Sequence, residues 1–449
     1  MAQTQEIEVL GARSVTPGPA KAGLHAWIAL VLLMLAQMIS QVDRAIINLV
    51  IGPIQSHYQI SDTQFGTLQG LAFGLFYTVM ALPIAALADR YQRRIVVGVG
   101  IAVFSFFTFF TGFARNFTQL FIARIGVGTG EASVSPAGYS LITDYFPARQ
   151  LGRAMSLFTM SSFVGTSVAM IGGGALVGYL TARAAGGHAL PLGMSLLECV
   201  FLAVAIPGLI LAPCFFFLRE PVRTGVDASA AEKLSLRALY QELKVQRRFL
   251  ALMILAMAMV STLSYAMTLW TPALFMRVYG WSPAHVGFWV GMVYLVGGIG
   301  GSYFAGAMVD RLTQRGVTDA PVKVAAFAVA GCGVTASVYP LMPSAPLSLL
   351  LFFPAIFFKA MPFACAPTAL QLVVPNRLRA QLGAIYITLI SIIGLVCGSI
   401  FVGLMTDYLF HAPKDVRYSL SLLVAIATPI MVISMGLARK PYRLLRQRG

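Results

Sequence analysis

The chain has 449 residues, of which 58% are hydrophobic and 11% are charged, and its mean hydropathy is +0.80. Soluble domains are roughly 45–50% apolar and about 25% charged, so a soluble fold of this length cannot bury so much apolar surface. The same composition excludes a disordered chain and a disulfide-built scaffold. The sequence therefore predicts an integral membrane protein.

The net charge of +16 does not indicate nucleic-acid binding. Basic residues gather in the short segments between apolar runs, and they do not form one stripe with interleaved aromatic residues. The five cysteines all lie inside apolar runs without a CxxC pair, and the five histidines show no ligand spacing. No GxxxxGK[ST] pattern is present. We therefore expect no metal, no cofactor, no ATP-driven pumping and no enzymatic activity.

Twelve segments are long and apolar enough to cross a bilayer, which takes about 20 residues. We predict an all-α membrane protein with twelve transmembrane helices in two six-helix bundles. The predicted spans are 25–51, 63–87, 94–113, 117–142, 152–180, 193–218, 249–276, 283–308, 322–341, 346–374, 380–410 and 416–437.

The longest hydrophilic interruption divides the chain into two halves. Residues 219–248 form the predicted linker, and its amphipathic stretch 232–248 is expected to lie along the membrane surface. It separates an N-terminal bundle (25–218) from a C-terminal bundle (249–437). Tails of 1–24 and 438–449 flank the bundles. With the N-terminus inside, only five of the 32 basic residues fall outside, so both termini are expected to be cytoplasmic, in the cell inner (plasma) membrane.

The two halves contain a repeat. A shift of 221 residues places Ser61, Gly66, Gly70 and Asp89 on Ser282, Gly287, Gly291 and Asp310. An Asp-Arg pair by itself only marks a basic inner loop, but the shared glycine positions favour related halves. Two related six-span halves are the architecture on which alternating access operates.

Spans one and four carry ionisable residues, which mark transport pathways by default. Asp43 and Arg44 lie in span one, and Arg124 and Glu131 lie in span four. At 1.5 Å per residue, Asp43 is about 12 Å and Arg124 about 10 Å below the outer ends of their spans, so these two side chains are level and can pair. The four residues are the predicted proton-coupling group. The alternative is a static ion-pair network that holds the two spans together.

Glu131 lies about 10 Å deeper than Arg124, with no cation close to it in sequence. Burial in a low dielectric disfavours a charged carboxylate. Glu131 is therefore the leading candidate for the proton carrier.

Lys359 lies near the centre of span ten, without an acid in its own half. It is expected to bind an anionic substrate group or to bridge to Asp43 or Glu131. Arg44, Arg124 and Glu131 complete the predicted polar part of the substrate site. Tyr77, Trp270 and Tyr294 are predicted wall residues.

Carboxylates beside arginines at the inner rim predict a cytoplasmic gate that latches the halves when the site faces outward. Basic residues that only set the topology would not need these aspartates. The predicted gate residues are Asp89, Arg90, Arg94, Asp144, Arg149, Arg153, Asp310 and Arg311.

The stretches AALADRYQRR and GAMVDRLTQR resemble the repeated inner-loop signature GxLaDrxGrr of the major facilitator superfamily, with Ala85 and Gln92 as departures in the first copy. QVDRAIINLV and RIGVGTGEASVSPAGYSLITDYFPARQ are similar to the spinster-type branch, in which Asp43, Arg44, Arg124, Glu131 and Asp144 match. Arg153 also matches. The resemblance implies proton-linked movement of lysophospholipids or sphingosine 1-phosphate by a twelve-helix carrier.

Three functions therefore stay open. The first is a proton-coupled transporter of an amphiphilic lipid-like molecule, with protons as the coupling ion, membrane lipids as surroundings and a monomeric carrier. The second is a proton-linked symporter of small organic anions, since such members of the superfamily have a similar Asp-Arg and Glu-Ala. The third is a lipid scramblase or sensor that does not pump.

Overall fold

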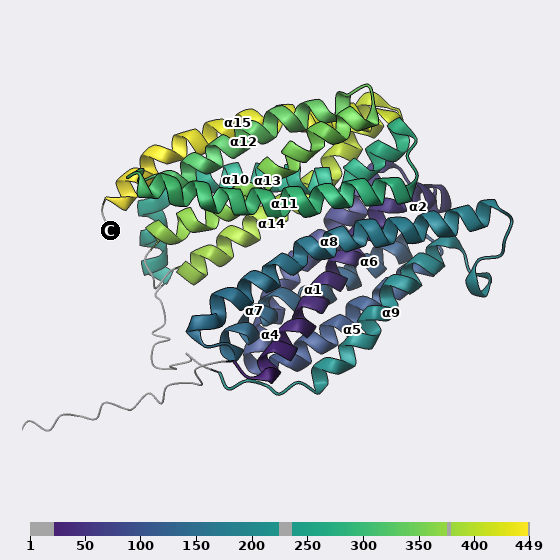
Figure 1. The fold of residues 1–449 in the computed structure, drawn as a ribbon, viewed down its shortest axis with the longest axis horizontal. Coiled ribbons are helices and arrows are strands. Elements are labelled where there is room, and N and C mark those ends of the chain that lie inside the picture. Colours follow the sequence, from purple (N-terminus) through teal and green to yellow (C-terminus); the bar gives the residue numbers. More distant parts are fainter. Residues whose placement is uncertain (1–21, 224–235, 375–378, 448–449) are drawn as a thin grey trace, which may run out of the picture.

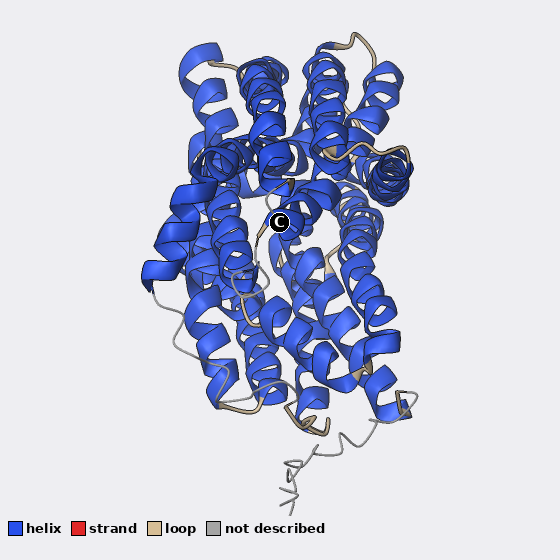
Figure 2. Cartoon of the chain, turned by 90° about the vertical axis from the view of Figure 1, so that its left-hand side faces the viewer, coloured by secondary structure: helices blue, strands red, loops and turns tan. Residues whose placement is uncertain are grey.

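The computed structural model describes residues 22–223, 236–374 and 379–447, and these ranges contain helices and loops without a strand (Figure 2). Within them, eleven helices are long and apolar enough to cross a membrane. The remaining predicted span, 117–142, consists of two shorter helices separated by a break. The predicted all-α architecture with twelve spans is confirmed, with this one span divided.

The N-terminal bundle contains the first six spans. Figure 1 shows it in purple to teal, beside the C-terminal bundle in green to yellow. Its elements are α1 (Leu24–Leu49), α2 (Ile51–Tyr58), α3 (Asp62–Thr67), the π-helix η1 (Leu68–Leu75), α4 (Phe76–Arg90), α5 (Arg93–Gly112), α6 (Phe117–Glu131), α7 (Val134–Tyr145), α8 (Ala148–Ala185), η2 (Pro191–Gly193) and α9 (Leu196–Phe216).

The C-terminal bundle contains the other six spans. Its elements are α10 (Leu236–Tyr279), α11 (Pro283–Gln314), α12 (Ala320–Val338), η3 (Tyr339–Leu341), α13 (Ala345–Val373), α14 (Arg379–Leu404), the π-helix η5 (Met405–Phe410), η6 (Pro413–Asp415) and α15 (Val416–Arg446). We call the end of the molecule that carries the described chain ends, Ala22 and Gln447, the termini side. The opposite end, with α2 and η6, is the far side.

The fourth span breaks at Ala132 and Ser133, directly after Glu131. Pro136 explains the position, because proline has no N–H to donate to the carbonyl four residues earlier, that of Ala132. Ser133 donates its N–H and its hydroxyl to the Gly130 carbonyl instead. Backbone that departs from a regular helix at membrane depth is tolerated where protein or a cavity surrounds it, and Glu131 lies at such a point.

The repeated glycines lie where the two bundles pack. Helices α3 and η1 pack against α14, and α11 packs against α8. A Cβ atom on Gly66 would overlap the Ser399 carbonyl oxygen, and one on Gly287 would overlap that of Met170. Glycine is required at both positions because the backbones approach closely. The repeated serines also match, since Ser61 caps α3 and Ser282 caps α11.

Two helices extend beyond the predicted boundaries of their bundles. The amphipathic stretch of the linker does not form a separate surface helix, because from Leu236 it is the first part of α10. The C-terminal tail likewise continues α15 as far as Arg446. Arg439 and Arg443 of this tail bind Asp319 before α12, which gives the added helical turns a partner. Residues 1–21 and 224–235 of the predicted tail and linker lie outside the described residues.

Candidate functional site

A cavity of about 450 Å³ lies between the two bundles. The N-terminal bundle contributes residues of α1, η1 and α8, and the C-terminal bundle contributes residues of α10, α11, α13 and α14. Its volume is in the range of small-molecule sites, about 300–1,000 Å³. A site shared by both bundles changes its access when one bundle moves against the other.

Polar side chains line this cavity at helical spacing. On α8 they are Thr159, Ser162 and Thr166, and on α10 they are Ser261, Ser264 and Thr268. Gln41, Asn48, Gln69, Ser391 and Ser399 add further donors and acceptors. Among the described lining residues none is acidic, whereas Arg44 and Lys359 are both basic.

Arg44 connects the cavity to Glu131. Its Nε atom lies 2.5 Å from Oε2 of Glu131, which also accepts a hydrogen bond of 2.8 Å from Ser40. Glu131 is fully buried, whereas the Arg44 side chain is 19% exposed and lines the cavity. The guanidinium lies over the ring of Tyr77, 4.2 Å from its centroid, which fixes the cation by its attraction to the ring.

Glu131 therefore has a close cation, contrary to the sequence-based expectation that it stands without one. Its other oxygen, Oε1, is buried and has no hydrogen-bond partner among the described residues. The carboxyl group is thus only half satisfied, and its one cationic partner faces the cavity. An anion that enters the cavity can compete with Glu131 for Arg44.

Asp43 and Arg124 form a second and closed pair, as their depths predict. Nη1 of Arg124 lies 2.9 Å from Oδ2 of Asp43, and both side chains are buried. Thr108 donates to the other oxygen of Asp43 at 2.5 Å. Because neither residue lines the cavity, the pair joins α1, α5 and α6 and does not meet a substrate.

A chain of amides links this closed pair to the C-terminal bundle. Arg124 donates to Gln69, Gln69 donates to Asn48, and Asn48 donates to the backbone carbonyl of Thr268 on α10. Gln69 belongs to the π-helix η1, and π-helical turns occur frequently at functional sites. Hydrogen bonds therefore connect the buried pair to α10.

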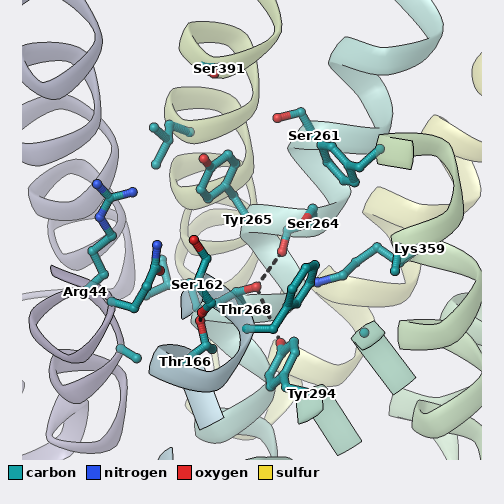
Figure 3. Close-up of a pocket in the computed structure, with 18 of the residues that line it drawn as sticks. Arg44, Ser162, Thr166, Ser261, Ser264, Tyr265, Thr268, Tyr294, Lys359 and Ser391 are labelled. Atoms are coloured by element: carbon teal, nitrogen blue, oxygen red, sulfur yellow. Dashed lines mark hydrogen bonds between the residues drawn. The ribbon is translucent and has the colours of Figure 1, made fainter. Parts of the chain in front are cut away.

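Lys359 reaches the cavity from α13 in the opposite bundle (Figure 3). Its Nζ atom lies 5.0 Å from the ring centroid of Tyr294, whose hydroxyl donates to Thr268 at 3.4 Å. Among the described residues Lys359 makes no ion pair. It does not bridge to Asp43 or Glu131, because arginines already occupy those carboxylates.

Of the three predicted wall residues, Tyr294 lines the cavity. The prediction is wrong for Trp270, which is fully buried among far-side contacts, with its Nε1 donating to the Ser399 carbonyl and its ring against Phe65. It is also wrong for Tyr77, which lies behind Arg44 and supports it. Arg124 and Glu131, predicted to touch substrate, lie one layer behind the cavity wall.

The contacts that two predicted gate residues, Asp144 and Arg94, make with described residues lie within the N-terminal bundle. Asp144 pairs with Arg93, a residue that the sequence analysis did not single out, and Arg93 also binds Glu220. Arg94 donates to the carbonyls of Phe216 and Leu218. Six further gate residues are exposed, and among the described residues none of them makes a salt bridge: Asp89, Arg90, Arg149, Arg153, Asp310 and Arg311. Their latching role stays a prediction for the opposite conformation.

On the far side the bundles are joined by an ion pair. Arg277 of α10 binds both carboxylate oxygens of Asp62 at the start of α3, at 2.6 and 2.7 Å, and it also donates to Gln55. Asp407 of η5 accepts from the backbone N–H groups of Asp62 and Thr63. Asp62–Arg277 is the one salt bridge between bundles within the described ranges, so the described conformation is held closed on this side.

Sequence reasoning missed the hydroxyl-rich wall and the far-side latch. A detectable signal existed for the wall, because Thr159, Ser162 and Thr166 repeat at intervals of three and four within an apolar run, the spacing of one helix face. Ser261, Ser264 and Thr268 show the same spacing. For the latch there was no local signal, since Asp62 and Arg277 are 215 residues apart.

Comparison with known proteins identifies the family of this chain. Residues 33–399 match the family model described as Major Facilitator Superfamily. The chain is 26% identical over 435 residues to an MFS-type efflux pump of Mycolicibacterium smegmatis, covering 93% of this chain and 94% of that protein. It is 25% identical to a probable L-galactonate transporter of Escherichia coli, covering 92% and 89%.

Spinster proteins are also similar. The chain is 30% identical to protein spinster homolog 1 of Mus musculus, over 56% of this chain and 46% of that one. A bacterial homolog of the human lysosomal transporter Spinster, solved in an inward-facing and unoccupied conformation, superposes with a TM-score of 0.78. The aligned identity is 23%, and 95% of this chain and 98% of that chain are covered. The resemblance to the spinster-type branch is thereby confirmed, and this structural likeness concerns the fold.

Proposed function

This chain belongs to the Major Facilitator Superfamily, a family of transporters, and we propose that it carries a small hydroxylated organic anion together with protons by alternating access. The observation that supports this most is the composition of the cavity wall. Two cations on opposite bundles face a space lined by hydroxyl and amide groups, and none of the described lining residues is acidic. A lysine and an arginine suit carboxylates, and the hydroxyl groups suit a polyhydroxylated chain.

Proton coupling follows from competition for Arg44. A substrate carboxylate that pairs with Arg44 takes the cation away from Glu131. A buried carboxylate without its cation is costly, so Glu131 takes up a proton when the substrate anion binds. The proton leaves when the substrate leaves and Arg44 returns to Glu131. A substrate that pairs with Arg44 and a proton therefore move together.

The far-side latch defines the state in which this exchange occurs. With Asp62 and Arg277 paired, we propose that the site is reached from the termini side. This side is proposed to face the cytoplasm of a cell with the protein in its inner membrane, because basic residues concentrate there. The printed name of the E. coli relative, a probable L-galactonate transporter, supports a sugar acid as substrate. We expect the monomer to suffice, since each chain contains a whole cavity.

An amphiphilic lipid-like substrate is the second candidate. Apolar side chains also line the cavity, among them Phe73, Phe163, Phe363, Ile390 and Leu395. The similarity to spinster homologs favours this candidate as well. It requires the lipid head group to occupy the Arg44–Lys359 region and the acyl chain to lie along these residues.

Proteoliposomes with a pH-sensitive dye inside test the proposal. We expect sugar acids that reach Arg44 with a carboxylate, galactarate among them, to cause substrate-dependent proton movement with the wild type. The Glu131→Gln variant should exchange substrate across the membrane without responding to a pH gradient. Glu198→Gln is the matched control, because Glu198 caps α9 outside the cavity and its loss should leave coupling intact.

Other outcomes distinguish the candidates. If the Glu131→Gln variant keeps the full response to a pH gradient, Glu131 is not the proton carrier. If lysolipids move and sugar acids neither move nor compete, the lipid-like substrate is correct. If lipid movement needs no gradient and survives neutralisation of both Asp43 and Glu131, the protein is a scramblase and does not pump.

A further inference from the structure

We infer that the cavity selects a dianion, with one anionic group at Arg44 and the other at Lys359, and that the charge of the substrate decides whether a proton accompanies it. This inference rests on the proposed function and specifies its substrate class. It is carried by the placement and the pairing of the charged groups around the cavity.

Without a bound substrate, the described charged groups around the cavity have one uncompensated positive charge. Arg44 is paired with Glu131, whereas Lys359 makes no ion pair among the described residues. Asp43 and Arg124 neutralise each other behind the wall. The other titratable groups near these cations are neutral side chains: Tyr77 and Tyr265 near Arg44, and Tyr294 and Cys332 near Lys359.

The two cations lie on opposite sides of the cavity (Figure 3). Ser162, Thr166 and Thr268 lie between them in this view. A substrate that reaches both cations therefore needs an anionic group at each end and hydrogen-bonding groups in the middle. An aldaric acid, a sugar chain with a carboxylate at both ends, has this pattern.

Charge balance then determines how many protons accompany each substrate. A monoanion at Lys359 neutralises the cavity and leaves the Arg44–Glu131 pair intact, so no proton is needed. A dianion must also take Arg44, which would leave Glu131 charged and the loaded site with a net charge of about −1. Uptake of one proton by Glu131 restores neutrality, and a neutral loaded site is the least costly to bury. Diacids should therefore be carried with one more proton than monoacids.

Galactonate and galactarate are a matched pair of probes, because they share the four hydroxyl groups of the chain interior and differ at C6, which is a CH2OH group in galactonate and a second carboxylate in galactarate. Isothermal titration at pH 7 in buffers of different ionisation enthalpy measures affinity and proton uptake together. We expect galactarate to bind about tenfold tighter or more, since each charge-assisted hydrogen bond contributes about 1.5–3 kcal/mol and 1.4 kcal/mol is tenfold in affinity. Galactarate binding should take up one proton, and galactonate binding none.

Variants of Lys359 test whether this residue binds a carboxylate of both acids. Lys359→Met should lower the affinity for galactonate and for galactarate, and Lys359→Arg should keep both affinities and the preference for the diacid. Lys323→Met is the control, because Lys323 is exposed at the start of α12, outside the cavity. Thermal unfolding without substrate shows whether each variant is folded. If Lys359→Met does not fold, the affinities of the Lys359→Arg variant and the number of protons taken up by the wild type test the inference.

The possible failures are distinguishable. Equal affinity for the two acids, or equal proton uptake with both, overturns the dianion inference while the transport of sugar acids stands. If neither acid binds to the folded protein and lysolipids do, the proposed function itself is overturned.

Discussion

Two carboxylates that lie in neighbouring spans have different surroundings, and their surroundings assign them different roles. Asp43 receives hydrogen bonds on both oxygens and is closed off from the cavity. Glu131 has one oxygen without a partner and one paired with an arginine that the cavity reaches. A group that must exchange protons needs such access, whereas a group that holds helices together does not.

Asp43→Asn is expected to destabilise the protein because it leaves Arg124 buried without a counter-charge. Removal of one partner of a buried pair costs about 3–5 kcal/mol. Unfolding in detergent, followed by tryptophan fluorescence, should show this loss. The double variant Asp43→Asn with Arg124→Gln should recover part of it. A stable Asp43→Asn protein that loses only its proton coupling would contradict the structural role and make Asp43 a carrier.

At this scale the sequence predicted one ion pair and missed the other. Depth along straight helices was enough to match Asp43 with Arg124. Depth was not enough to match Arg44 with Glu131. The rotation of α1 about its axis turns the adjacent residues Asp43 and Arg44 toward different neighbours, and depth does not give this rotation. The same limit explains Trp270: composition marks it as a wall residue, but its face of α10 packs against Ser399 and Phe65.

Among the elements, interruptions of regular helices lie next to the site. Span four breaks after Glu131, and span two contains the π-helix η1 with Gln69 and Phe73 at the cavity. The break has a sequence signal in Pro136, although the apolar run continues through it and therefore predicted one helix. The π-helix has no such signal in the sequence, although Gly70 within it lies close to the backbone of Val396 on α14.

The contact between α12 and α15 supplies a pH-dependent contribution to stability. Asp319 is 2% exposed, and burial alone would raise its pKa, but hydrogen bonds from Arg439 and Arg443 hold the pKa below its ordinary value of 3.8. A carboxyl group with a depressed pKa stabilises the fold above its unfolded-state pKa, and this contribution is lost as the pH falls below it.

Asp319→Asn should therefore lower the free energy of unfolding by about 1 kcal/mol at neutral pH, because both arginines are partly exposed. The difference from the wild type should stay constant from pH 8 to pH 5 and shrink as the pH falls through about 3.8. Differential scanning fluorimetry across this range measures it. Asp310→Asn is the control, since Asp310 is exposed. A difference that grows on acidification would show that Asp319 does not act through its charge.

For the whole molecule, the internal repeat corresponds to two equivalent contacts between bundles. Gly66 brings span two onto α14, and Gly287 brings span eight onto α8. The sequence predicted two related halves and their glycines, since the repeat is visible without coordinates. It did not predict which side is closed. A carrier has the same sequence in both conformations, and only the contacts between its bundles differ.

The ion pair between Asp62 and Arg277 is expected to favour the conformation that is closed on the far side. Charge-assisted hydrogen bonds contribute about 1.5–3 kcal/mol, so Arg277→Gln should raise the ratio of far-side-open to far-side-closed molecules about tenfold or more. Spin labels at Ser56 and Lys414, exposed on opposite bundles, report the far-side distance by double electron–electron resonance in a variant whose native cysteines are replaced.

Asp62→Asn should have the same effect as Arg277→Gln, and the double variant should add little, because either change breaks the same ion pair. Arg417→Gln, at a partly buried far-side arginine that contacts its neighbour Tyr418, should leave the distances unchanged. Identical distance distributions in all variants would mean that glycine packing at Gly66 and Gly287 closes this side without help from the ion pair.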